Sequence, residues 1–194
     1  GVSLPWMAFG YGLSVTPLQT LTLYNAVAND GVMVKPIFVS EIKEWNKTIK
    51  KFNTEVINPK ICSQETLDKV QAVLENVVKK GTGSKLYSKD FSMAGKTGTA
   101  QVNYKDKSKL YYASSFVGYF PADEPKYSCI IVVHKPNVAA GYYGADVAGP
   151  VFKRIAQKIF TDSPSTNHVK NIDAKVVSQE KNYKEFYKKA EKAE

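Results

Sequence analysis

The feature that most restricts the fold of this chain is a short turn between two apolar runs. Residues 123–126, Asp-Glu-Pro-Lys, separate an apolar stretch near 112–120 from another near 127–134. Both stretches are rich in the β-branched and aromatic residues that favour strands. A connection this short leaves no room for a crossover helix. The pattern therefore predicts a hairpin of two antiparallel strands.

A third strand and three helices are expected around this hairpin. The strand is predicted at 92–98, and helices are predicted to start at Thr16-Pro17, after Ser63 and at Pro150, because Thr and Ser cap helices and Pro suits a first helical turn. Apolar residues recur at helical spacing in each helix. They are Leu18, Leu21, Tyr24 and Ala28 in the first, Leu67, Val70, Val73, Leu74, Val77 and Val78 in the second, and Val151, Phe152, Ile155, Ala156, Ile159 and Phe160 in the last.

The remaining segments complete the expected organisation. Short β-rich runs around a turn at Asn46 predict a hairpin excursion at about 32–57. These runs are 32–34, 37–39 and 48–52. The Gly- and Ala-rich residues 138–149 are expected to form a loop, and the Lys/Glu/Asn-rich residues 161–194 a charged linker or tail. The whole order predicts an α+β fold over residues 1–160, with helices packed on an antiparallel sheet.

Charge and cysteine usage exclude some classes of function. The net charge is +9, but the lysines are scattered and Arg154 is the single arginine, so a solvated basic surface is expected rather than a nucleic-acid interface. Attraction to an anionic cell-envelope polymer or lipid surface is the alternative. Cys62 and Cys129 have no metal-binding spacing, and no metal or cofactor is expected. The sequence has no apolar run of membrane-spanning length and opens on Gly1 rather than Met, which suggests part of a longer protein.

The strongest candidate for chemistry is the segment 95–101, GKTGTAQ, on the first predicted strand. Lys96 supplies a positive charge, and the hydroxyls of Thr97 and Thr99 can donate hydrogen bonds to a carboxylate. Gly98 has no Cβ, so a ligand backbone can approach the strand closely. The Thr99 N–H could form half of an oxyanion hole. Taken alone, the segment also fits an ordinary polar strand with a glycine bulge.

Other motifs surround this segment in a fixed order. They are GYGLSVTPLQ at 10–19, NDG at 29–31, KP at 35–36, VV at 77–78, GTG at 81–83, FVGYFP at 116–121 and GPVF at 149–152. Together with GKTGTAQ they resemble the class B penicillin-binding proteins, the FtsI-like peptidoglycan D,D-transpeptidases. The resemblance covers residues 8–160 and implies the C-terminal part of a transpeptidase domain with a partial penicillin-binding/β-lactamase-like fold.

The resemblance implies a serine acyltransferase that needs no cofactor. Its substrate is the D-Ala-D-Ala end of a peptidoglycan stem peptide, and β-lactams acylate the same serine. Carried over by position, Lys96, Thr97, Gly98 and Thr99 bind the substrate, and the Thr99 N–H serves the oxyanion hole. The implied location is the inner membrane with the domain on the periplasmic side. The implied partners are other cell-wall synthesis proteins, and a role in division is favoured over elongation.

The family's S-x-x-K and S-x-N motifs, which carry the nucleophile and its proton path, lie upstream of the T-P-L-Q motif. Loose matches begin at Ser40, Ser178 and Ser165, but the first lies in the hairpin excursion and the others follow K-T-G in the wrong order. The nucleophile is therefore expected outside this chain, which alone is expected to be inactive. Missing strands would expose a sheet edge and favour self-association.

Two other functions fit the same residues. One keeps the fold but changes the reaction, giving a β-lactamase or a β-lactam sensor domain. The T-P-L-Q and KTGTAQ sequences favour the transpeptidase over this reading. The other is a non-catalytic module that uses the strand to hold peptidoglycan peptides. An upstream S-x-x-K and S-x-N in the complete gene would favour an enzyme, and their absence would favour the binding module.

Overall fold

A computed structural model describes residues 3–8, 10, 12–103, 106 and 108–162. The chain divides into two units, Gly1–Ala156 and Gln157–Glu194, and the sheet lies in the first. The predicted tail beyond residue 162, including Ser165 and Ser178, lies outside the described residues. No helix in the described ranges is both long enough and apolar enough to cross a bilayer.

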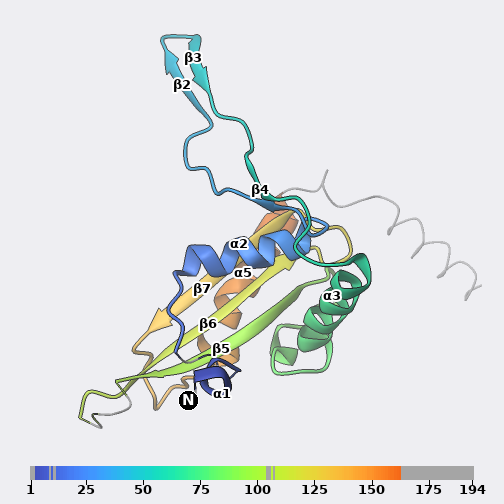
Figure 1. The fold of residues 1–194 in the computed structure, drawn as a ribbon. Helices are drawn as coiled ribbons and strands as arrows, with labels where there is room; N and C mark the ends of the chain where they lie inside the picture. The colour runs from blue at the N-terminus through green and yellow to red at the C-terminus, as the bar shows by residue number, and fades with distance from the viewer. Residues whose placement is uncertain (1–2, 9, 11, 104–105, 107, 163–194) are drawn as a thin grey trace, which may run out of the picture. The chain divides into compact units, whose positions relative to one another are not determined.

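The elements alternate between helices and antiparallel strands along the chain (Figure 1). The helices are α1 (Ser3–Ala8), α2 (Pro17–Ala28), α3 (Gln64–Lys79), η1 (Ser84–Leu86), α4 (Gly144–Val147) and α5 (Gly149–Asp162). The strands are β1 (Met33–Val34), β2 (Glu41–Glu44), β3 (Lys47–Lys51), β4 (Val56–Asn58), β5 (Ala94–Val102), β6 (Tyr111–Phe120) and β7 (Tyr127–His134).

The central sheet has three strands in the order β5-β6-β7, and both pairings are antiparallel. Thr97 pairs with Phe116 on β6, and Phe116 pairs with Ile131 on β7. The predicted hairpin around residues 123–126 is thus β6–β7. The α+β prediction, with helices on an antiparallel sheet, is confirmed.

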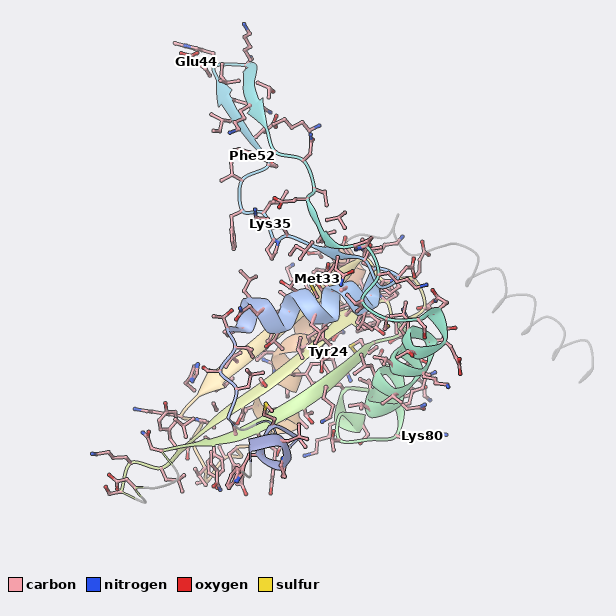
Figure 2. All side chains as sticks on the ribbon, viewed as in Figure 1. Tyr24, Met33, Lys35, Glu44, Phe52 and Lys80 are labelled. Atoms are coloured by element: carbon pink, nitrogen blue, oxygen red, sulfur yellow. The ribbon has the colours of Figure 1, made fainter. Side chains whose placement is uncertain are left out.

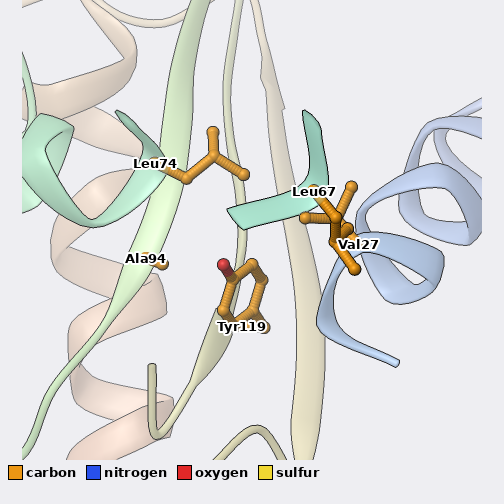
Figure 3. Close-up of a cluster of buried hydrophobic side chains, with 5 residues drawn as sticks. All are labelled: Val27, Leu67, Leu74, Ala94 and Tyr119. Carbon is orange, nitrogen blue, oxygen red and sulfur yellow. The ribbon is translucent and has the colours of Figure 1, made fainter. Parts of the chain in front are cut away.

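Side-chain alternation along β6 divides the core between the two faces of the sheet. Tyr119 is buried on one face in a cluster with Val27, Leu67, Leu74 and Ala94, which come from α2, α3 and β5 (Figure 3). Phe116 and Phe120 point to the opposite face, where their rings lie 4.7 and 5.5 Å from the ring of Phe152 on α5. The α2 and α3 helices therefore cover one face, and the first turns of α5 cover the other (Figure 1).

The helix starts follow the capping chemistry expected from the sequence. Thr16 and Gln19 form a capping box at the start of α2, in which each side chain accepts the other residue's backbone N–H. The Ser63 hydroxyl accepts the Thr66 N–H at 3.2 Å at the start of α3. The chain leaves α2 through Asp30 and Gly31, whose φ angles are 49° and 80°, as the NDG segment predicts.

In the excursion at 32–57, β1 and β3 match the predicted runs at 32–34 and 48–52 to within one residue, whereas β2 lies after the predicted run at 37–39. Strands β2 and β3 pair on either side of the turn at Trp45 and Asn46, and Figure 2 shows this hairpin projecting from the sheet and helices, with Glu44 at its far end. The β2–β3 pairing ends where Phe52 donates its N–H to the Ser40 carbonyl, and pairing resumes further from the turn between β1 and β4. Residues 37–39, predicted as β-rich, lie between β1 and β2 and form no strand.

Three other details differ from the sequence predictions. The predicted apolar face of α3 is too wide, because Val70 and Val73 are 36% and 62% exposed. Strand β5 continues past residue 98 to Val102, because β6 offers pairing partners as far as Tyr111. The predicted loop at 138–149 contains the short helix α4.

Candidate substrate-binding strand

The predicted substrate-binding residues lie on β5, which is the edge strand of the central sheet. Within the described residues, β6 is the single strand that pairs with β5. Lys96 and Thr99 are exposed, whereas Thr97 and Gly98 are partly buried. The structure therefore presents the K-T-G-T segment along an open strand edge, as an extended ligand would require.

Alternation places Thr97 and Thr99 on one face of β5 and Lys96 on the other. Because β5 is an edge strand, the long side chain of Lys96 can bend around it. Its Nζ donates to the Thr97 carbonyl oxygen at 3.0 Å and to Thr97 Oγ1 at 3.3 Å. The amine and both hydroxyls thus gather at the Thr97 side of the strand. Such a group can bind a carboxylate through charge-assisted hydrogen bonds.

The two threonine side chains are held by segments from either side of the strand. Thr97 Oγ1 lies 2.9 Å from Thr82 Oγ1, in the turn just before η1. Thr99 Oγ1 accepts the backbone N–H of Gly144, the first residue of α4, at 3.1 Å. A hydroxyl that accepts from an N–H keeps its own hydrogen for another partner. The Thr99 hydroxyl can therefore still donate a hydrogen bond to another partner.

Glycines allow α4 and β6 to pack closely against the strand. A Cβ on Gly144 would lie 2.6 Å from the Gly98 carbonyl oxygen, and one on Gly98 would lie 2.5 Å from Ser115 Oγ. The Gly144 contact is with backbone and excludes a Cβ, whereas a Cβ on Gly98 would require the Ser115 hydroxyl to move. Gly98 thus has an intramolecular role, to make room for Ser115, in addition to the ligand approach predicted from the sequence.

Three tyrosines line the face of the sheet next to Thr99. The Tyr112 and Tyr142 rings stack with their centroids 4.2 Å apart, and the Tyr142 and Tyr143 centroids are 4.4 Å apart. Tyr142 donates its phenol to the Tyr143 phenol at 3.1 Å. This hydrogen bond, with repulsion from a charged Tyr143, raises the pKa of Tyr142 to about 12. The Tyr142 phenol therefore stays protonated over the physiological range.

The S-x-x-K match at Ser40 falls within the described residues. Ser40 lies just before β2 in the projecting hairpin. Lys43 pairs with the Glu41 carboxylate at 2.6 Å. The Lys43 amine is thus paired with a carboxylate, and the expectation that Ser40 is not the nucleophile stays a prediction.

Several residues that contact the candidate strand or join the segments beside it were not predicted from the sequence. Thr82 was quoted within the GTG motif without a role, and Gly144 and Asp146 were assigned to a loop. Lys85, which donates to Asp146 Oδ1 at 2.5 Å, was not singled out. The GTG motif is a signal that could have identified Thr82. No local pattern marks Asp146, because its partner Lys85 is 61 residues away.

An antiparallel sheet covered by helices on both faces, with K-T-G on its edge strand, defines a protein of the penicillin-binding and β-lactamase-like class. Residues 3–157 match the family model of the penicillin binding protein transpeptidase domain. The chain belongs to this family, as the class B resemblance predicted.

Individual relatives agree with this assignment. The chain is 34% identical over 155 residues to peptidoglycan D,D-transpeptidase FtsI of Buchnera aphidicola, covering 79% of this chain and 26% of the relative. It is 35% identical over 155 residues to stage V sporulation protein D of Bacillus subtilis, covering 76% and 23%. The chain thus spans about a quarter of the length of these relatives.

A solved structure supports the fold directly. The apo structure of the TP domain of Burkholderia pseudomallei penicillin-binding protein 3 matches with a TM-score of 0.61 at 28% identity. The match covers 80% of this chain and 45% of that one.

Proposed function

We propose that this chain contributes the substrate-carboxylate side of the active site in a peptidoglycan D,D-transpeptidase. The observation that carries the proposal is the edge strand β5, where the Lys96 amine and the Thr97 and Thr99 hydroxyls lie within the family's K-T-G-T motif. The relatives named as D,D-transpeptidases support the same reaction. The substrate is the D-Ala-D-Ala end of a stem peptide, and β-lactams bind in its place.

Each residue has a proposed role in this reaction. A serine from outside these 194 residues attacks the penultimate D-Ala carbonyl, terminal D-Ala leaves, and the acyl-enzyme passes to an amine of a neighbouring peptide. Lys96, Thr97 and Thr99 hold the terminal carboxylate, and the Thr99 N–H stabilises the oxyanion. Gly98 keeps the strand surface open to the peptide backbone. The reaction as proposed uses no cofactor.

The remaining expectations also stand as proposals. Residues 1–160 form the C-terminal portion of the transpeptidase domain, with the excursion at 32–57, and residues 161–194 a charged linker. The full-length protein acts in cell-wall synthesis and division with other envelope proteins, anchored in the inner membrane with this domain outside. The open edge of β5 supports self-association when the chain is expressed alone, and a monomer in light scattering would contradict that expectation.

Covalent labelling of the full-length protein by a fluorescent penicillin tests the proposal. The wild type should be labelled with one molecule per chain, and residues 1–194 alone should remain unlabelled. Thr97→Val and Thr99→Val should each slow labelling about tenfold or more, since each loses a hydrogen bond to a charged group. Thr48→Val, on the projecting β2–β3 hairpin, is the matched control and should label at the wild-type rate. A wild-type protein that is not labelled would refute the proposal.

A further inference from the structure

Two segments that flank β5 are joined to each other by an ion pair. Lys85 Nζ, in η1, lies 2.5 Å from Asp146 Oδ1, in α4. Each of these segments also contacts a threonine of the strand: Thr82, just before η1, contacts Thr97, and Gly144 of α4 contacts Thr99. The three contacts therefore connect Thr97 to Thr99 through η1 and α4.

These contacts bear on the position of α4, because α4 is a single short turn. Its four residues follow a loop in which Gly141 has a φ of 126°. Besides the Gly144–Thr99 bond, the Ser114 hydroxyl donates to the Tyr142 carbonyl just before the turn. Asp146 donates its N–H to the Tyr143 carbonyl at 2.8 Å, so its carboxylate is part of the same turn as Gly144. A displacement of Asp146 therefore also displaces the Gly144 N–H that contacts Thr99.

The ion pair is better suited to positioning than to overall stability. The side chains of Lys85 and Asp146 are 73% and 26% exposed, and pairs this accessible to water stabilise a fold only weakly. Small displacements of a group that contacts a reacting substrate, in contrast, have large effects on rate. The η1 segment, which carries Lys85, is connected to β5 through the contact between Thr82 and Thr97.

We propose that Lys85 and Asp146 are positioning residues that hold α4 so that Gly144 fixes the Thr99 hydroxyl as a donor to the substrate carboxylate. The inference rests on the proposed function, because it assumes that Thr99 binds that carboxylate. Neither residue touches the substrate. Their effect on acylation passes through Thr99 and is absent when Thr99 has no hydroxyl.

The test measures the second-order rate constant of acylation of the full-length protein by benzylpenicillin. Lys85→Met and Asp146→Asn should each lower it about three- to tenfold, and the double variant should be no slower than either single variant because the two residues act as one unit. Lys85→Arg keeps the charge and should restore most of the rate. Lys69→Met breaks an ion pair with Glu65 that is 2.6 Å long on α3 and more exposed than the Lys85–Asp146 pair, and it should leave the rate unchanged.

The decisive comparison repeats Lys85→Met in the Thr99→Val background. The rate constant should then be the same with Lys85 or Met, since the hydroxyl that the pair positions is gone. An equal loss in both backgrounds would show a merely structural role and overturn the inference. So would an unchanged rate in Lys85→Met, or an equal loss in Lys69→Met. A wild-type protein that benzylpenicillin does not acylate would instead refute the proposed function.

Discussion

The hydroxyl oxygens of Thr82 and Thr97 lie 2.9 Å apart, which ties the turn before η1 to the candidate substrate strand. Thr97 Oγ1 also accepts a hydrogen bond from the Lys96 amine. A lysine ammonium only donates, so it cannot accept the Thr97 hydroxyl hydrogen. Thr82 is therefore a second partner that sets the direction of the Thr97 hydroxyl. This relation connects two motifs, GTG and K-T-G, that are separate in the sequence.

Removing the Thr82 hydroxyl should affect acylation more than stability. Thr82→Val keeps the side-chain shape but leaves Thr97 without this partner, and a hydrogen bond of this kind contributes about 1 kcal/mol, or about fivefold in rate. The rate of penicillin acylation of the full-length protein measures the loss. Thr82→Ser, which retains a hydroxyl, is the control and should stay near the wild-type rate. Equal losses in both variants would contradict the role of the hydroxyl.

Gly118 should be intolerant of any side chain. It pairs with Gly95 across β5 and β6, and a Cβ at this position would collide with the Ala94 carbonyl oxygen and lie 2.9 Å from the Gly95 Cα. Gly118→Ala should lower the free energy of unfolding by about 1–3 kcal/mol, because overpacking forces the strands apart. Urea denaturation of the full-length protein measures it. Ala100→Ser, at an exposed position of β5, should change the value by less than about 0.5 kcal/mol.

The core on the α5 side of the sheet depends on Phe152. Its side chain is fully buried and its ring packs against Phe116 and Phe120. Phe152→Ala should cost about 3–5 kcal/mol of unfolding free energy through lost burial and the cavity left behind. The neighbouring Val151, 41% exposed, provides the control, and Val151→Ala should cost far less. Similar losses in the two variants would argue against the packing of α5 on this face.

Tyr119 should make the fold sensitive to alkaline pH. Burial first, and then the charge of Glu75, raises the pKa of Tyr119 to about 12, from 10 for a free tyrosine. Between these two values the unfolded state loses the phenol proton before the folded state does, so stability falls as pH rises from about 10 to about 12.

Tyr119→Phe removes this titration and keeps the ring in the core. Its unfolding free energy should therefore fall less steeply than that of the wild type over the same pH range. The exposed Tyr87→Phe variant controls for the loss of one phenol. Parallel curves for wild type and Tyr119→Phe would contradict the raised pKa.

The sequence was most informative where structure is local. The caps at Thr16 and Ser63 and the turn at residues 123–126 are set by neighbouring residues, so the helices and the β6–β7 hairpin could be predicted. The end of β5 could not be predicted, because it depends on how far β6 continues to offer backbone pairing partners. The exposure of Val73 likewise depends on which stripe of α3 the sheet covers, and periodicity alone does not reveal it.

The candidate site was predictable only in part for the same reason. The motif at Lys96, Thr97 and Thr99 is contiguous, and the structure places all three at the sheet edge. The contacts from Lys85, Asp146 and Gly144 join segments that are 45 to 61 residues apart. Such partners depend on tertiary packing, and a single sequence carries no local sign of them.

The most direct test of the central claim is a crystal structure of the full-length protein acylated by a penicillin. The penicillin carboxylate oxygens should lie about 2.6–3.2 Å from Thr97 Oγ1 and Thr99 Oγ1, and the acyl carbonyl oxygen the same distance from the Thr99 nitrogen. A carboxylate bound elsewhere, with neither hydroxyl in hydrogen-bond range, would contradict the assignment of β5 as the substrate-binding strand.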